Sequence, residues 1–173
     1  MKEKYIVKFE FSTGKSATLC LESKCAPKTV EHFVSLIEKG VLNGTIFHRI
    51  IEDFMIQGGG YKIEENSLME VEGVESVVGE FNSNGFENNL KHELGVISMA
   101  RTSDKNSGTS QFFLCSATCP WLDGEYAAFG YCLDEESKEA ILEISKVETC
   151  QPHPYFQNFP VEVVGIDKVY VLE

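Results

Sequence analysis

One stretch of the chain places a permanent cation and an amide between large apolar side chains. Arg49 and Gln57 stand in the segment 47–60, whose other side chains are largely Phe, Ile and Met and whose last three residues are glycines. Arginine keeps its proton at any ordinary pH, so it is costly on an apolar surface unless it has a polar partner or task. The glycines permit close approaches that a Cβ would block. The pattern predicts a site that orients a mostly apolar ligand carrying a few polar atoms.

Other catalytic patterns have weaker support in the sequence. No GxSxG nucleophile motif occurs, and the glycines at 58–60 are followed by Tyr61-Lys62 rather than by the GK[ST] of a phosphate-binding loop. A thiol pair of Cys115 with His48 stays open as an alternative, because the sequence cannot place the two side chains together. No metal site is predicted. The remaining histidines lack metal-ligand spacing and are interpreted as structural: His32, His92 and His153.

The bulk composition indicates a single globular domain over residues 1–173. Hydrophobic residues make up 43% of the chain, and the formal net charge of −12 argues against a nucleic-acid or anionic-membrane partner. Neither a basic start followed by an apolar run nor a stretch of about 18 apolar residues occurs, so a soluble, cytoplasmic protein is expected. The six cysteines form no CxxC pair and are expected to be reduced. The short polar termini make a monomer the expected state.

Short strands and two helices would have to position the candidate residues. Alternating apolar residues predict strands at 4–11, 16–21, 45–51, 54–57, 95–100, 111–115 and 127–133, and a closing strand pair within 161–172. Helical spacing predicts one helix between Pro27 and Gly40 and a second one after Asp134. Residues 58–89 are expected to form a long loop that is functional or mobile. About eight strands with two helices predict a mostly β fold, a barrel with helical lids.

Several motifs together resemble the cyclophilins, the cyclosporin-binding peptidyl-prolyl cis–trans isomerases. The matching blocks stand in the family's order and spacing: 47–59 (FHRIIEDFMIQGG), 95–100 (GVISMA), 110–113 (SQFF), 121–124 (WLDG) and 129–130 (FG). Residues 79–86 look like a bacterial branch of the family. The resemblance spans nearly the whole chain. It implies one isomerase domain, a closed eight-stranded antiparallel β-barrel capped by two α-helices, with the substrate groove outside the barrel.

The resemblance also implies roles for the residues that match the family motifs. Arg49 is the expected catalytic residue, and Gln57 is expected to hydrogen-bond the substrate backbone and to help fix Arg49. An apolar pocket for the proline ring would be formed by Phe54, Met55, Phe113 and Leu122.

The rest of the groove departs from the family pattern at some positions. Ala100 and Arg101 would line the groove with their backbone, and Gln111 would lie near a neighbouring pocket. Trp121 matches the cyclosporin-contacting tryptophan, and Tyr126 stands where the family often has His. Arg101 takes a place where Asn is frequent, so a changed preference for peptides and cyclosporin is expected.

The implied chemistry needs no cofactor and no metal. An X–Pro bond rotates through a twisted state with a barrier of ~18–20 kcal/mol, and no bond is made or cleaved. In that state the prolyl nitrogen gains a lone pair that a guanidinium N–H can meet. The expected partners are proline-containing polypeptides, with cyclosporin as a further ligand. The alternative is a proline-peptide binding or chaperone-like module with little turnover.

Overall fold

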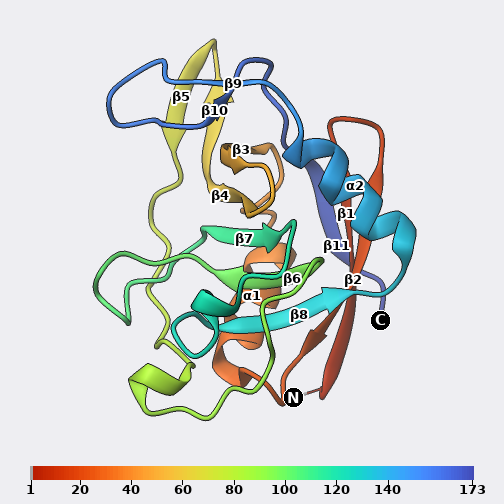
Figure 1. Ribbon diagram of the computed structural model, residues 1–173, viewed down its shortest axis with the longest axis vertical. Helices are drawn as coiled ribbons and strands as arrows, with labels where there is room; N and C mark the ends of the chain where they lie inside the picture. Colours follow the sequence, from red (N-terminus) through yellow and green to blue (C-terminus); the bar gives the residue numbers. More distant parts are fainter. Residues whose placement is uncertain (1) are drawn as a thin grey trace.

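The computed structural model describes residues 2–173, and antiparallel β-structure dominates it (Figure 1). The strands are β1 (Lys4–Phe11), β2 (Ser16–Glu22), β3 (Thr45–Ile51), β4 (Met55–Glu64), β5 (Ser67–Glu70), β6 (Val96–Met99), β7 (Phe112–Cys115), β8 (Ala128–Cys132), β9 (Thr149–Cys150), β10 (Phe159–Pro160) and β11 (Ile166–Val171). The helices are α1 (Pro27–Glu38) and α2 (Glu135–Ser145), with 3₁₀ turns η1 (Asn82–Asn84) and η2 (Pro120–Leu122). The mostly β fold with two α-helices is confirmed.

The main sheet curls into a barrel that is not fully closed. Its strands follow the order β11-β1-β2-β8-β6-β7-β4-β3, and β5 adds to β4 as a ninth strand. The two ends of this path meet through an isolated bridge between Ile46 and Gly165, supported by a hydrogen bond from Phe47 N to Val164 O (2.9 Å), rather than through a continuous ladder. The predicted eight-stranded path is therefore correct, but "closed" overstates the pairing between β3 and β11.

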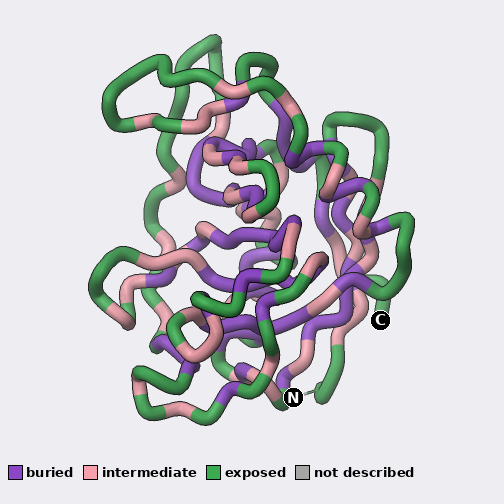
Figure 2. The backbone as a smooth tube through the Cα atoms, viewed as in Figure 1, coloured by how far each residue is buried: buried purple, intermediate pink, exposed green. Residues whose placement is uncertain are grey.

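The core lies between the curled sheet and the two helices (Figure 2). Val30, Phe33 and Ile37 form the buried face of α1, as their helical spacing predicts. Asp134 caps α2, where its side chain accepts a hydrogen bond from Ser137 N. Large aromatic rings fill much of the remaining volume and contact one another across the sheet: Phe9, Phe11, Phe33, Phe47, Phe112 and Phe129.

Two sequence predictions about strands were wrong. Residues 58–70 are not loop, because β4 continues to Glu64 and turns into β5. This hairpin lacks the usual signal since Ile63, Leu68 and Met69 are all at least 36% exposed, so no apolar face alternates with a polar one. The expected strand pair within 161–172 is a single strand, β11, while β10 ends at Pro160 and pairs with β9.

A buried carboxylate from a distant loop caps α1. The N-cap residue, Ala26, has no side chain able to do so. Instead, Glu80 Oε1 accepts hydrogen bonds from the backbone N–H (2.7 Å) and the hydroxyl (2.8 Å) of Thr29. Asn88 Nδ2 donates to the carbonyl oxygens of Glu80 and Ala128, which ties the same loop to β8. The second half of the expected mobile loop is therefore anchored.

Replacing Glu80 with alanine is expected to lower the free energy of unfolding by about 2–3 kcal/mol. The substitution removes the cap and leaves two buried donors of Thr29 without a partner. Urea denaturation of Glu80→Ala should be compared with Glu75→Ala, which removes an exposed carboxylate from the same segment. Equal stability losses in the two variants would contradict the capping role.

Candidate active site

A β-bulge decides which way Arg49 faces. Phe47 pairs with Gly58 and Arg49 pairs with Gln57, so β3 contains one extra residue, His48, at this point. In an unbroken strand Phe47 and Arg49 would point to the same face. The bulge instead lets Phe47 and Ile50 enter the core while Arg49 lines a surface cavity.

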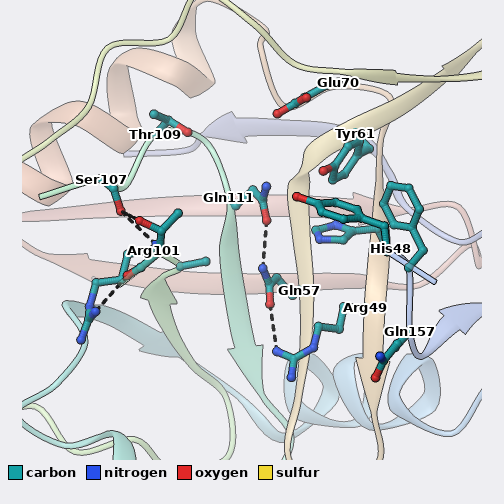
Figure 3. A pocket seen from close by; sticks show the side chains of 14 residues that line it. His48, Arg49, Gln57, Tyr61, Glu70, Arg101, Ser107, Thr109, Gln111 and Gln157 are labelled. Carbon is teal, nitrogen blue, oxygen red and sulfur yellow. Dashed lines mark hydrogen bonds between the residues drawn. The ribbon is translucent and has the colours of Figure 1, made fainter. Parts of the chain in front are cut away.

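A relay of amide side chains holds the guanidinium of Arg49 (Figure 3). Arg49 Nη1 donates to Gln57 Oε1 at 3.3 Å, and Gln57 Nε2 donates to Gln111 Oε1 at 2.9 Å. The relay starts on β3, crosses β4 and ends at the residue before β7. It engages one of the five N–H groups of the guanidinium, so the fork keeps further donors that a ligand could meet.

The glycine run makes room for this relay. A Cβ on Gly60 would lie 2.5 Å from Cγ and 2.6 Å from Cδ of Gln111, so the missing side chain is what lets Gln111 lie across β4. Gly59 adopts a φ of +85°, and its carbonyl accepts a hydrogen bond from Ser110 Oγ (2.7 Å). The glycines therefore act through backbone geometry and close packing beside the site.

A cavity of about 200 Å³ lies next to Arg49, with an apolar side and a polar side. The apolar wall is formed by Phe54, Met55, Phe113, Leu122 and the ring of Tyr126. Its polar side is formed by Arg49, Gln57 and Arg101, with Ala100 beside them. Trp121 is 60% exposed, and its ring lies 5.7 Å from that of Phe54. The fold thus gathers all residues predicted for the groove, with Gln111 joined through the relay.

Behind the cavity, His92 holds the ring of Phe113. The two rings are stacked, with centroids 5.9 Å apart. His92 is 1% exposed, and its ring nitrogens lie 2.9 Å from Asp123 Oδ1 and 2.9 Å from Ser98 Oγ. Burial lowers the pKa of His92 despite the nearby carboxylate of Asp123, so the ring is neutral. In the neutral ring, Nδ1–H donates to Asp123 and Nε2 accepts from the hydroxyl of Ser98. The sequence interpretation of His92 as structural did not include this positioning of a pocket residue.

The side chain of Arg101 points away from the relay of Arg49, Gln57 and Gln111 (Figure 3). Its guanidinium lies 4.6 Å from the ring centroid of Tyr126 and 4.9 Å from that of Phe81. It also donates to the carbonyl oxygen of Glu125 through Nε (3.1 Å) and Nη2 (2.7 Å). Besides the predicted backbone contribution, Arg101 therefore clamps one wall of the apolar cavity, through a cation–π contact that sequence reasoning did not anticipate.

The thiol alternative finds no support in the chemistry of Cys115. Burial raises the pKa of this thiol well above its ordinary value, whereas a nucleophile needs a lowered one. All six cysteines are free thiols. Within residues 2–173, no group of three or more His, Cys, Asp or Glu side chains is arranged to hold a metal ion. No helix of this part of the chain is long and apolar enough to cross a membrane.

His48 is buried without charge beside Arg49. The ring is 8% exposed, and its buried Nδ1 has no hydrogen-bond partner. Burial, and then the positive charge of Arg49, lower the pKa of His48 from 6.5 to about 4.

This shift predicts a loss of stability in mild acid. Between pH 6.5 and 4 the unfolded chain binds a proton at His48 and the folded protein does not, so stability is fully present above pH 6.5 and falls as the pH drops through this window. The loss amounts to about 3 kcal/mol at 1.36 kcal/mol per pKa unit. Urea denaturation at pH 7, 5.5 and 4 should show a shallower decline for His48→Gln. Parallel declines in both proteins would assign the acid sensitivity to other groups, of which His92 is the first.

The chain is similar to proteins of one family along nearly its whole length. The family described as cyclophilin type peptidyl-prolyl cis-trans isomerase/CLD matches residues 6–171. Peptidyl-prolyl cis-trans isomerase A of Dickeya dadantii is 38% identical over 158 residues, which is 90% of this chain and 78% of the relative. Peptidyl-prolyl cis-trans isomerase cyp18 of Streptomyces antibioticus is 32% identical over 174 residues, covering 96% and 98% of the two chains.

Solved structures agree with the sequence matches. A cyclophilin type peptidyl-prolyl cis-trans isomerase of Cryptosporidium parvum superposes with a TM-score of 0.76 at 24% identity and covers 98% of each chain, so it shares the fold. The crystal structure of that protein in the presence of the dipeptide Ala-Pro gives a TM-score of 0.75 at 25% identity, covering 97% of this chain and 99% of the other. The fold is thus shared with these proteins.

Proposed function

The chain belongs to the cyclophilin-type peptidyl-prolyl cis–trans isomerases, and from this premise we propose that Arg49 accelerates X–Pro rotation by donating a hydrogen bond to the prolyl nitrogen. One observation carries the proposal. The guanidinium, fixed through Gln57 and Gln111, lines a cavity of about 200 Å³ whose opposite side is apolar. A donor held still beside a space for a small ring suits a substrate whose reacting atom is the ring nitrogen.

The acceleration arises from a difference between two states of the substrate. In the planar amide the prolyl nitrogen shares its lone pair with the carbonyl and accepts hydrogen bonds poorly. In the twisted state the nitrogen becomes pyramidal and can accept from an N–H of Arg49. Because this interaction is stronger in the twisted state than in the planar one, it lowers the barrier rather than merely tightening binding. A charge-assisted hydrogen bond contributes about 1.5–3 kcal/mol.

The apolar cavity supplies the rest of the effect. Phe113, Leu122 and Met55 would hold the proline ring by van der Waals contact and exclude water, which otherwise favours the polar, planar amide. Gln57 would hydrogen-bond the flanking backbone, so one side of the bond is held while the other turns. The stacking of His92 on Phe113 and the contact of Arg101 with Tyr126 keep these walls in place before substrate arrives.

Measuring the cis–trans exchange rate of a short X–Pro peptide by NMR, with and without catalytic amounts of the protein, tests this proposal. Exchange is expected to speed up in proportion to protein concentration. The chain has a single tryptophan, Trp121, beside the cavity, so its fluorescence reports peptide binding in the same samples. Binding without faster exchange would overturn the proposal in favour of a proline-peptide binding or chaperone-like module with little turnover.

The proposed partners are proline-containing polypeptides, with cyclosporin as a ligand of the same groove. The structural neighbour studied with Ala-Pro supports the first of these, and the exposed ring of Trp121 supports the second. If cyclosporin binds there, it should quench or shift the fluorescence of Trp121 and slow exchange of the X–Pro peptide at matching concentrations. A monomeric state and a cytoplasmic location stay predictions from the sequence.

A further inference from the structure

A second, larger cavity continues the groove beyond Arg49. It measures about 520 Å³, within the ~300–1,000 Å³ typical of ligand sites. Four residues line both cavities and connect them: Arg49, Gln57, Ala100 and Arg101. The far wall of the second cavity comes from the β4–β5 hairpin and from residues 155–157, which the proposed isomerase mechanism does not use (Figure 3).

Aromatic rings form this far wall. The Tyr61 ring meets the His48 ring edge-on at 4.8 Å and the Phe156 ring at 5.2 Å, and Tyr155 meets Phe156 at 5.4 Å. Tyr61 is 9% exposed, so its ring is fixed in the wall. The second cavity therefore offers aromatic surface suited to the methylene stem of a long side chain or to a cation.

A carboxylate and two phenols meet at the same wall. Tyr61 pairs with Glu70 across the β4–β5 hairpin, and both line the cavity together with Tyr155. Burial, then the negative charge of Glu70 and the nearby Tyr155 hydroxyl, raise the pKa of Tyr61. Glu70 lines the cavity and takes part in no salt bridge among residues 2–173. Its charge is therefore available to a ligand.

The two arginines that line the second cavity find their partners outside its far wall. Arg101 points its guanidinium toward the carbonyl oxygen of Glu125 and the ring of Tyr126. Arg49 donates to Gln57 at the boundary of the two cavities, and His48 is neutral because its pKa lies at about 4. The wall formed by Tyr61, Glu70 and Tyr155 thus presents oxygen acceptors and one negative charge.

We propose that the second cavity binds a lysine or arginine side chain that lies within a few residues of the isomerised proline. The inference rests on the proposed function, since it names the substrate class of the same groove. The stem would lie on the rings of Tyr61 and Phe156, and the cationic head would reach the carboxylate of Glu70 and the phenolic oxygens. An acidic side chain would face the charge of Glu70, and the net charge of −12 favours approach of basic segments.

The test is a peptide series in which one residue at a time, from three before the proline to three after it, is Lys, Gln or Glu. At one position kcat/KM for the Lys peptide should exceed that for the Gln peptide by about two- to fivefold, with the Glu peptide slowest. Glu70→Gln should reduce the Lys-to-Gln ratio toward one. Glu72→Gln removes an exposed charge close to Glu70 in sequence but outside the cavity lining, and it should leave the ratio as in the wild type.

The outcomes separate this inference from the proposed function. Acceleration of all peptides without a Lys preference, or equal loss of the preference in Glu70→Gln and Glu72→Gln, would overturn the cavity's role and leave the isomerase mechanism standing. Absence of acceleration for every peptide would overturn the mechanism instead. In that case Trp121 fluorescence titrations with the Lys and Gln peptides decide the cavity's role by affinity, and equal affinities would overturn it.

Discussion

Arg49→Ala is expected to lower kcat/KM for an X–Pro peptide by about ten- to a hundredfold or more, with the fold intact. The variant loses a charge-assisted hydrogen bond worth about 1.5–3 kcal/mol in the twisted state, which corresponds to this range of rates. Most of the loss should appear in kcat rather than in KM, because the interaction is made chiefly in the transition state. NMR exchange rates at several peptide concentrations separate the two parameters.

Two controls show whether the loss is chemical. Arg49→Lys keeps the charge but not the planar fork that meets Gln57 Oε1, so its activity should fall between those of the wild type and Arg49→Ala. Urea denaturation should give similar unfolding free energies for both variants, since Arg49 lines a cavity rather than the core. If Arg49→Ala turned over the peptide as fast as the wild type, the apolar cavity alone would account for catalysis, and the donor mechanism would be wrong.

Gly59→Ala is expected to cause the largest stability loss, about 3 kcal/mol or more out of the ~5–15 kcal/mol typical of a domain. Two effects add. A side chain at φ +85° is strained by about 1–2 kcal/mol, and the new Cβ would overlap the carbonyl oxygen of Ser110 and lie 3.0 Å from the ring of Phe112. Because backbone and a core ring form the obstacle, β4 and β7 would have to separate locally. Urea midpoints of variant and wild type measure the loss.

Gly60→Ala provides a matched control in the same glycine run. Here the new Cβ meets the side chain of Gln111, which can rotate away, so the stability loss should be clearly smaller than in Gly59→Ala. Displacing Gln111 would break its hydrogen bond with Gln57 and loosen Arg49, so isomerase activity should fall several-fold even at full folding. We infer that Gly59 is needed for stability and Gly60 for the position of Gln111. Equal stability losses in the two variants, or full activity of folded Gly60→Ala, would contradict this inference.

The elements with one buried face are predictable from residue order. Tyr5, Val7 and Phe9 alternate along β1, and Val30, Phe33 and Ile37 recur at helical spacing along α1, so burial leaves a periodic trace in the sequence. The β4–β5 hairpin leaves no such trace because both faces of its outer half are exposed. The hairpin is visible only in its backbone pairing and in the contact of Tyr61 with Phe156, a residue far along the chain.

The candidate site also has features that the sequence predicts and features that only the fold determines. The sequence was enough to predict the site residues Arg49, Gln57 and the apolar residues of β4 and β7. A cation among apolar residues is costly, and the motifs resemble one family. The bulge at His48 could not be predicted from the sequence, because it depends on how β3 pairs with β4 rather than on the residue types in β3. The cap that Glu80 gives Thr29 and the clamp of Arg101 on Tyr126 likewise join segments that local propensity treats separately.

The sequence by itself determined the family, the mostly β fold and the residue types that the proposed reaction needs, because periodicity and charge placement are local properties of the chain. Only the tertiary structure decided the direction of Arg49, the relay from Gln111 and the second cavity at Tyr61 and Glu70. These features depend on strand register and on close approach across more than 50 residues of sequence, as between Gln57 and Gln111. Such contacts form when the barrel curls, and no short-range pattern records them.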